Sequence, residues 1–300
     1  MNDQVRIVEV GPRDGLQNEK TPITVEARVA FIENLIGAGL QTIEIGSFVS
    51  PKAIPQMVNS DQVLRAVDRH PDREFHVLVP NEKGYEAAKA AGAKVIAVFA
   101  SASEGFSHAN INCTVAESIA RFTPVVQRAK ADGIKVRGYV SCVLGCPYDG
   151  EVKPSAVAAV AKKLWDLGCY EVSLGDTIGV GTPSKARELL RAVAAEVPMA
   201  NLGMHFHDTY GQALANLYAG LEEGARVIDS AAGGLGGCPY APGATGNVAT
   251  EDVVYMLEGM GIATGVDMQR LVAATNEISK LIGKPPVSRV ASAINAGKRA

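Results

Sequence analysis

The chain has 300 residues, 47% of them hydrophobic, which is ample for a buried core. Its formal net charge of −3 gives no reason to expect nucleic acid or an anionic membrane surface as a partner. No apolar run approaches the roughly 18 residues of a membrane span. The first strand-like run begins at Val5 and leaves no room for a signal or transit sequence before it. We therefore expect a cytoplasmic protein.

The cysteines also indicate a reducing compartment. Their number is odd in a long chain with a large core, so a disulfide framework is not expected: they are Cys113, Cys142, Cys146, Cys169 and Cys238.

Short β-like runs alternate with amphipathic helical runs along the chain. The predicted strands cover residues 5–10, 42–48, 73–80, 94–100, 135–143, 170–175, 201–207 and 226–232. The helices predicted to follow them cover about 25–39, 61–70, 81–91, 114–131, 155–167, 183–197, 211–223 and 250–259. Glycines end several of these helices, at 39, 92, 133, 168 and 224.

Eight strand–helix units of regular spacing predict an α/β protein with a TIM (β/α)8 barrel. We expect one catalytic domain over 1–300, with one or two additional helices over about 267–300. A doubly wound open sheet is the alternative. That fold usually has fewer strands and a glycine-rich phosphate-binding turn after the first strand, where this chain has Arg13-Asp14-Gly15 instead.

Two histidines end the seventh predicted strand. His205 and His207 are two residues apart, and side chains at this spacing on a strand point to the same face. Two imidazoles joined by a carboxylate from another strand form a plausible divalent-metal site. The pair favours a metal-dependent enzyme, although a histidine near a core is often only a structural hydrogen-bonding residue.

Other polar residues follow the same ends of the predicted strands, where barrel enzymes place their active sites. They are Arg13, Asp14, Glu44, Asp176, Cys238 and Asn247. Glu44 lies between two isoleucines, and a carboxylate pointing into a barrel needs a partner, for which Arg13 is the nearest choice. Taken alone, Asp14 is equally well explained as a turn salt bridge and Asp176 as a helix cap or turn residue.

The segment from Ala232 to Asn247 is rich in glycine and contains Cys238. Glycine permits backbone conformations that other residues resist, so this loop can move over a ligand and bring in a proton donor or nucleophile. An incidental thiol in a flexible loop explains the same pattern.

Three segments together resemble the 3-hydroxy-3-methylglutaryl-CoA lyases: residues 8–19, the His205-Phe206-His207-Asp208 run and the glycine loop over 233–240. The resemblance extends over about residues 5–290, and the cysteine loop is its most specific motif. Isopropylmalate and homocitrate synthases share the Arg-Asp-Gly turn and the histidine pair but are not known for this loop.

The resemblance implies a metal-dependent retro-Claisen cleavage of (S)-3-hydroxy-3-methylglutaryl-CoA to acetyl-CoA and acetoacetate. The cofactor it implies is Mg²⁺ or Mn²⁺, and the expected assembly is a homodimer. This chemistry would serve leucine catabolism and ketone body formation.

The resemblance also implies roles for individual residues. Asp14, His205, His207 and the amide oxygen of Asn247 would bind the metal. Arg13, held by Glu44, would stabilise the enolate, and Cys238 would protonate the product carbanion. Asp14 or His205 would take the hydroxyl proton. Asp176 belongs to the expected catalytic set, and the expected substrate-binding residues are Arg13, Gln17, Lys20 and Asn110.

Four other functions remain open from the sequence. One is a lyase for a related thioester with a longer branch. A second is a Claisen synthase of the isopropylmalate synthase type, and a third is an aldolase acting on a 4-hydroxy-2-oxo acid. The fourth is a non-catalytic metal-binding barrel.

Overall fold

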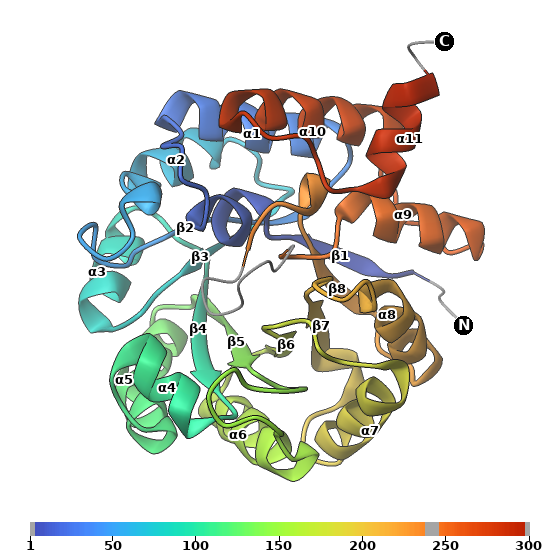
Figure 1. The fold of residues 1–300 in the computed structure, drawn as a ribbon. Helices are drawn as coiled ribbons and strands as arrows, with labels where there is room; N and C mark the ends of the chain where they lie inside the picture. Colours follow the sequence, from blue (N-terminus) through green and yellow to red (C-terminus); the bar gives the residue numbers. More distant parts are fainter. Residues whose placement is uncertain (1–3, 238–245, 298–300) are drawn as a thin grey trace.

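Eight parallel strands form a closed barrel in the computed structural model, which describes residues 4–237 and 246–297 (Figure 1). Strands adjacent in sequence are adjacent in the barrel, and the last strand pairs with the first. The TIM barrel predicted from the sequence is confirmed. The strands are β1 (Arg6–Glu9), β2 (Thr42–Ser47), β3 (Glu74–Leu78), β4 (Val95–Ser101), β5 (Lys135–Ser141), β6 (Glu171–Asp176), β7 (Leu202–Phe206) and β8 (Val227–Ser230).

Helices surround the barrel and cover the outer face of its strands (Figure 1). Their apolar sides pack against outward-facing valines, isoleucines and leucines of the strands to form the main hydrophobic core. The helices that link consecutive strands, with α9 after β8, are α1 (Val25–Gly37), α2 (Ser60–Val67), α3 (Glu82–Ala90), α5 (Val115–Ala131), α6 (Pro154–Leu167), α7 (Pro183–Ala194), α8 (Ala213–Glu222) and α9 (Thr250–Gly259).

Two helices follow the eighth unit, as the sequence predicts. Helix α10 (Met268–Ile282) lies beside α1, and α11 (Arg289–Gly297) lies beside α9 (Figure 1). Asp267 caps α10 by accepting hydrogen bonds from the amides of Gln269 and Arg270. Within the described residues, no helix combines the length and the hydropathy needed to cross a membrane.

The helices end just before the glycines that were predicted to terminate them. Residues 39, 92, 133, 168 and 224 all have positive φ values, between 71° and 113°, which glycine adopts without strain. The N-terminus of α1 is capped by Thr24, whose hydroxyl accepts a hydrogen bond from the amide of Ala27. These caps fix where each helix stops and the next strand begins.

Two elements of the candidate site, both at the C-terminal end of the barrel, are not predicted by the sequence pattern. One is the short helix α4 (Glu104–Ile111), which precedes α5 and buries only Phe106 and Ser107. The other is a single wide helical turn over Gly11–Gly15 directly after β1. Both are too short for a clear helical period to show in the sequence, and both contribute to the site described next.

Candidate active site

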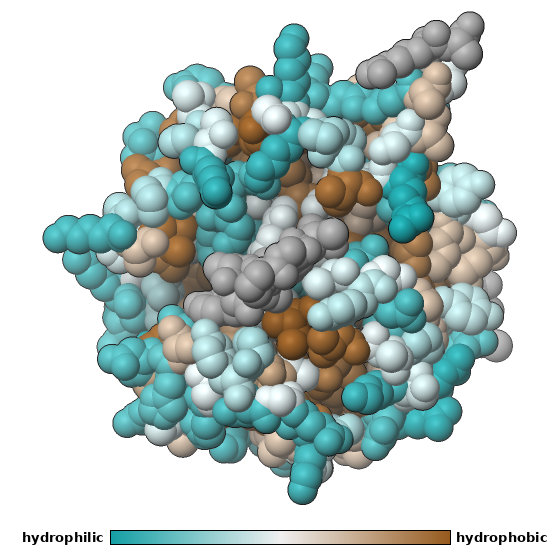
Figure 2. Space-filling model, viewed as in Figure 1, coloured by the Kyte–Doolittle hydropathy of each residue, from teal (hydrophilic) through white to brown (hydrophobic). Residues whose placement is uncertain are grey.

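A cavity of about 470 Å³ opens at the carboxyl ends of the strands. Its polar wall includes Arg13, Asp14, Gln17, His205 and His207, and the rest is largely apolar. Hydrophilic side chains predominate around the edge of this face of the molecule, and hydrophobic residues form separate patches between them (Figure 2). A depression of about 660 Å³ around the amino end of β3 is larger, but it contains none of the predicted site residues.

Arg13 is held against Glu44 across the end of β2. Its Nε and Nη2 lie 2.7 and 2.6 Å from the same carboxylate oxygen, Glu44 Oε2. Glu44 is fully buried and Arg13 is 6% exposed, so the pair lies in a poorly solvated environment where charge-assisted hydrogen bonds are strong. The pairing predicted from the sequence is confirmed. It aims the guanidinium at the cavity.

Asp14 lies at the centre of a polar cluster. Arg13 Nη1 donates to its Oδ1 at 2.7 Å, and Asn247 Nδ2 donates to its Oδ2 at 2.8 Å. Burial raises the pKa of this carboxyl, but the nearby charges of Arg13 and the two histidines hold it well below its usual range. Asp14 is therefore a carboxylate at neutral pH.

The two histidines face Asp14 from the end of β7. His205 Nε2 is 4.0 Å from Asp14 Oδ2, and the two imidazole centroids are 5.3 Å apart. One ligand atom from each of Asp14, His205 and His207 lies within 4.8 Å of the others. His207 Nδ1 is buried and has no hydrogen-bond partner among the described residues.

This donor set fits a divalent metal ion. Burial, reinforced by the charge of His205, lowers the pKa of His207 to about 4, so its imidazole is neutral and able to ligate. A carboxylate oxygen with two imidazole nitrogens suits several divalent ions, including Mg²⁺, Mn²⁺ and Zn²⁺. The buried nitrogen without a partner is the kind of atom that a bound ion would satisfy.

Residues 4–278 match the model of the HMGL-like family. The chain belongs to this family. It is 58% identical over 293 residues to the 3-hydroxy-3-isohexenylglutaryl-CoA/hydroxy-methylglutaryl-CoA lyase of Pseudomonas aeruginosa, with 98% of each chain covered. It is 53% identical over 292 residues to the hydroxymethylglutaryl-CoA lyase of Pseudomonas mevalonii, with 97% of each chain covered. The crystal structure of hydroxymethylglutaryl-CoA lyase from Pseudomonas aeruginosa matches with a TM-score of 0.97 and 57% identity, covering 99% of this chain and 100% of that one.

The resemblance predicted from the motifs is therefore confirmed over nearly the whole chain. The barrel, with its added C-terminal helices, is the same fold as that of the HMGL-like lyase from Pseudomonas aeruginosa. The family match does not by itself identify the residues that bind metal and substrate in this chain.

The substrate-binding residues expected from the HMGL-like resemblance do not all reach the cavity. Gln17 and Asn110 line it, and Gln17 Oε1 is buried without a hydrogen-bond partner among the described residues. Lys20 is exposed and is not part of the cavity wall. Cys238 lies outside the described residues.

Asp176 occupies a different position from Asp14 and Glu44, the other acidic residues predicted for the site. Its carboxylate accepts hydrogen bonds from the amides of Val180 at 3.2 Å and Gly181 at 2.8 Å, in the loop after β6. Burial raises its pKa to about 6, against the opposing effect of these hydrogen bonds. The structure thus places Asp176 at the same end of the barrel but binds its side chain to its own loop.

A group of polar residues inside the barrel was not predicted from the sequence. Arg137, Tyr139, Ser173 and Asp229 lie on β5, β6 and β8 and are buried beneath His205. The edge of the Tyr139 ring packs on His205 at 5.9 Å between centroids, and its hydroxyl accepts from Arg137 at 2.7 Å. A charged residue among apolar strand residues, the signal that identified Glu44, also marks Arg137 and Asp229.

Two buried glutamates anchor the loops of the site. Glu9 Oε1 accepts hydrogen bonds from the amides of Gly11 at 2.8 Å and Ala232 at 2.9 Å, so it joins the Arg13 turn to the glycine-rich segment. Glu251, at the start of α9, accepts from the amide of Gly233 at 2.9 Å. Burial raises the pKa of each carboxyl to about 7.

Proposed function

We propose that this chain is a hydroxymethylglutaryl-CoA lyase that cleaves (S)-3-hydroxy-3-methylglutaryl-CoA to acetyl-CoA and acetoacetate with Mg²⁺ or Mn²⁺. The observation that carries the proposal is the convergence of Asp14, His205 and His207 beside the Arg13–Glu44 pair. The names of the full-length relatives support the same substrate and reaction.

The metal ligands in this proposal are Asp14, His205, His207 and the amide oxygen of Asn247. When bound there, a divalent ion would polarise the C3 hydroxyl of the substrate and favour loss of its proton. Asn247 already touches Asp14, although its amide nitrogen makes that contact in this structure. The same nitrogen also donates to the carbonyl of Leu235 at 3.1 Å, so the ligand role requires the amide to turn over and give up both hydrogen bonds.

Arg13 is the proposed stabiliser of the developing enolate. Cleavage of the C2–C3 bond leaves its electron pair on the acetyl-CoA fragment, and negative charge builds on the thioester oxygen. A fixed guanidinium facing that oxygen stabilises the transition state more than the ground state. Glu44 supports this role by holding Arg13 through two nitrogens.

Two protons must move for the reaction to balance. The C3 hydroxyl loses its proton as the ketone of acetoacetate forms, and we propose Asp14 or His205 as the group that receives it. The acetyl-CoA carbanion gains a proton at C2, for which we propose the thiol of Cys238. Asp176 would act indirectly, by fixing the loop after β6.

The CoA end of the substrate would leave the site along the wall formed by Gln17 and Asn110. The buried Oε1 of Gln17 has no hydrogen-bond partner in the part of the chain that the structure describes, which supports a ligand hydrogen bond at this point. Lys20 is exposed, and a long cationic side chain at the surface suits contact with the phosphates of CoA.

A second candidate is a lyase for a thioester with a longer branch at C3. The Pseudomonas aeruginosa relative carries an isohexenyl substrate in its name. The cavity offers apolar wall beyond what one methyl group needs, from residues that include Ile54, Leu78, Phe99, Phe106 and Ile111. The ratio of kcat/KM for the isohexenyl and methyl thioesters decides between the two substrates.

The decisive experiment measures both products at once. Incubation with 3-hydroxy-3-methylglutaryl-CoA should release acetyl-CoA and acetoacetate in equal amounts. A Claisen synthase would instead release free CoA from acetyl-CoA only when a 2-oxo acid is supplied. An aldolase would act on a 4-hydroxy-2-oxo acid without CoA, and a binding protein would turn over none of these compounds.

We also propose a cytoplasmic location and a homodimer. The four cysteines that the structure describes are buried free thiols, which supports a reducing compartment. Light scattering of the purified protein at a series of concentrations checks the dimer.

A further inference from the structure

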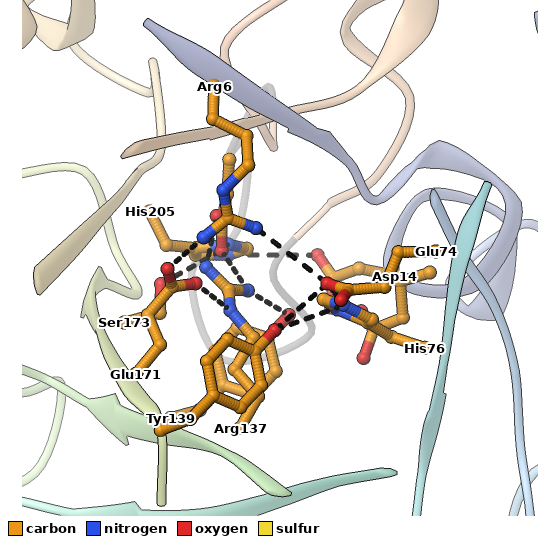
Figure 3. Close-up of polar contacts among 12 residues, drawn as sticks. Arg6, Asp14, Glu74, His76, Arg137, Tyr139, Glu171, Ser173 and His205 are labelled. Atoms are coloured by element: carbon orange, nitrogen blue, oxygen red, sulfur yellow. Dashed lines mark hydrogen bonds and ion pairs between the residues drawn. The ribbon is translucent and has the colours of Figure 1, made fainter. Parts of the chain in front are cut away.

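The interior of the barrel carries a continuous polar network that ends at His205. Figure 3 shows Arg137, Tyr139, Glu171, Ser173 and His205 within it. A buried charged network costs free energy to assemble, so each member must be satisfied by its neighbours. The connection between this network and the metal site has a specific consequence for His205.

The two ring nitrogens of His205 face different carboxylates. Nε2 points towards Asp14 at 4.0 Å, on the side where the metal ligands converge. Nδ1 points the other way, to Asp229 Oδ2 at 3.3 Å. A histidine that ligates through one nitrogen is oriented by the group that the other nitrogen contacts.

Asp229 is fully buried and cannot turn away from His205. Arg137 Nη2 donates to its Oδ1 at 2.6 Å and Arg137 Nη1 to its Oδ2 at 2.9 Å, which is a two-point contact with the guanidinium. The hydroxyl of Ser173 also donates to Oδ2, at 2.8 Å. Both carboxylate oxygens are held by these donors, and Oδ2 can still accept one further hydrogen bond, from His205 Nδ1.

Arg137 is itself fixed from its other side. Its Nε donates to Glu171 at 2.6 Å, and Glu171 also pairs with Arg6. Arg6 lies 3.9 Å from Glu74 as well, so Arg137 is the guanidinium that pairs directly with Asp229. Asp229 already makes a two-point contact with this guanidinium, and a neutral His205 with its proton on Nδ1 can donate the further hydrogen bond to Oδ2.

We propose that Asp229 is the positioning residue of the metal site: it holds His205 as the Nδ1–H tautomer with the Nε2 lone pair aimed at the ion. This inference rests on the proposed function, because it takes His205 as a metal ligand. Asp229 touches neither the metal ligands Asp14 and His207 nor the cavity. It acts through His205.

Calorimetric titration of the metal-free protein with Mn²⁺ tests the proposal. Replacing a carboxylate that orients a metal-ligating histidine typically lowers metal affinity by about 10- to 100-fold, and we expect this of Asp229→Asn. The matched control is Glu171→Gln, since Glu171 is also buried and contacts the same Arg137 at 2.6 Å but does not touch His205. Its loss of affinity should stay below that range.

Three outcomes overturn the proposal. Unchanged affinity in Asp229→Asn does so while leaving the proposed function intact. Equal losses in both variants show that disturbance of Arg137, rather than the contact with His205, is responsible. Absence of Mn²⁺ binding by the wild-type protein removes this inference and the proposed metal site together.

A second measurement determines the tautomer of His205 in the wild-type protein itself. The wild-type protein, labelled with ¹⁵N-histidine and loaded with Mg²⁺, should show His205 protonated at Nδ1, with its signal assigned by its loss in His205→Gln. A proton on Nε2 would contradict the proposal directly, because Nε2 could not then bind the ion.

Discussion

Two nitrogens of Arg13 contact the same carboxylate oxygen of Glu44. Two guanidinium nitrogens lie 2.7 and 2.6 Å from Glu44 Oε2, while Oε1 is buried without a hydrogen-bond partner among the described residues. The third nitrogen of Arg13, Nη1, contacts Asp14. Glu44 therefore fixes the guanidinium beside the proposed metal ligand, from a strand that contributes no ligand itself.

Glu44→Gln should reduce catalysis much more than substrate binding. The amide keeps the shape of the side chain but removes the charge that aligns Arg13 with the developing enolate. We expect kcat to fall by about 100-fold with a small change in KM, as for loss of an aligned transition-state donor. Steady-state kinetics checks this.

The control for this variant is Asp61→Asn, because Asp61 pairs with Arg65 on the exposed surface of α2. Exposed pairs contribute little, so this variant should behave as wild type. A kcat for Glu44→Gln equal to that of the control would contradict the proposed role of the pair.

His207→Ala should weaken metal binding. It removes one of three converging ligands, and we expect at least a tenfold loss of Mn²⁺ affinity by calorimetry. His108→Ala is the matched control, since His108 is exposed on α4, outside the ligand cluster. Equal affinity of the two variants would exclude His207 from the site.

Glu9 should make stability depend on pH. Burial raises the pKa of its carboxyl from 4.5 to about 7, against the opposing hydrogen bonds from Thr250, Ala232 and Gly11. A carboxyl whose pKa is higher in the folded state binds its proton more tightly there. Its contribution to stability is therefore fully present below pH 4.5 and is lost as the pH rises through 7.

The rise in the pKa of Glu9 corresponds to a loss of about 3 kcal/mol in the free energy of unfolding as the pH rises from 4.5 to above 7. Glu9→Gln stays neutral, so its unfolding free energy should fall less than that of the wild type between pH 5 and pH 8. Urea titrations of both proteins at the two pH values give the difference. Parallel pH dependences would show that Glu9 titrates normally in the folded state.

Gly246 should not tolerate a side chain. Its φ is +85°, and an added Cβ would lie 2.5 Å from the backbone carbon of Gly236. Gly246→Ala should lower the free energy of unfolding by about 2 kcal/mol and weaken Mn²⁺ binding through its neighbour Asn247. Among the described residues, an added Cβ at Gly237 meets no atom within 4 Å, so Gly237→Ala should retain wild-type stability. Similar thermal midpoints for the two variants would refute this account of the loop.

Much of the fold could be predicted because each strand–helix unit carries its own signals. Buried strands appear in the sequence as short apolar runs, and glycines at positive φ mark where the helices end. Helix α4 could not be predicted in this way. It has only eight residues, includes Gly105 and buries one large apolar side chain, Phe106, so no apolar period develops.

The site was predictable where neighbours in sequence are neighbours in space. His205 lies on β7 and His207 follows the end of that strand, and Arg13 precedes Asp14. The supporting residues were harder to find because their pairing spans the chain: Arg137 and Asp229 are 92 residues apart, and Glu9 meets the amide of Ala232 across 223 residues. A buried charge signals that a partner exists, but only the closed barrel determines which one.

The central claim is that metal held by Asp14, His205 and His207 enables carbon–carbon cleavage of the thioester. The most direct test follows acetyl-CoA and acetoacetate release from 3-hydroxy-3-methylglutaryl-CoA by metal-stripped protein, before and after addition of Mg²⁺ or Mn²⁺. The account predicts no release before addition and equal release of both products afterwards. Equal rates before and after addition, or no release by folded protein in either condition, would contradict it.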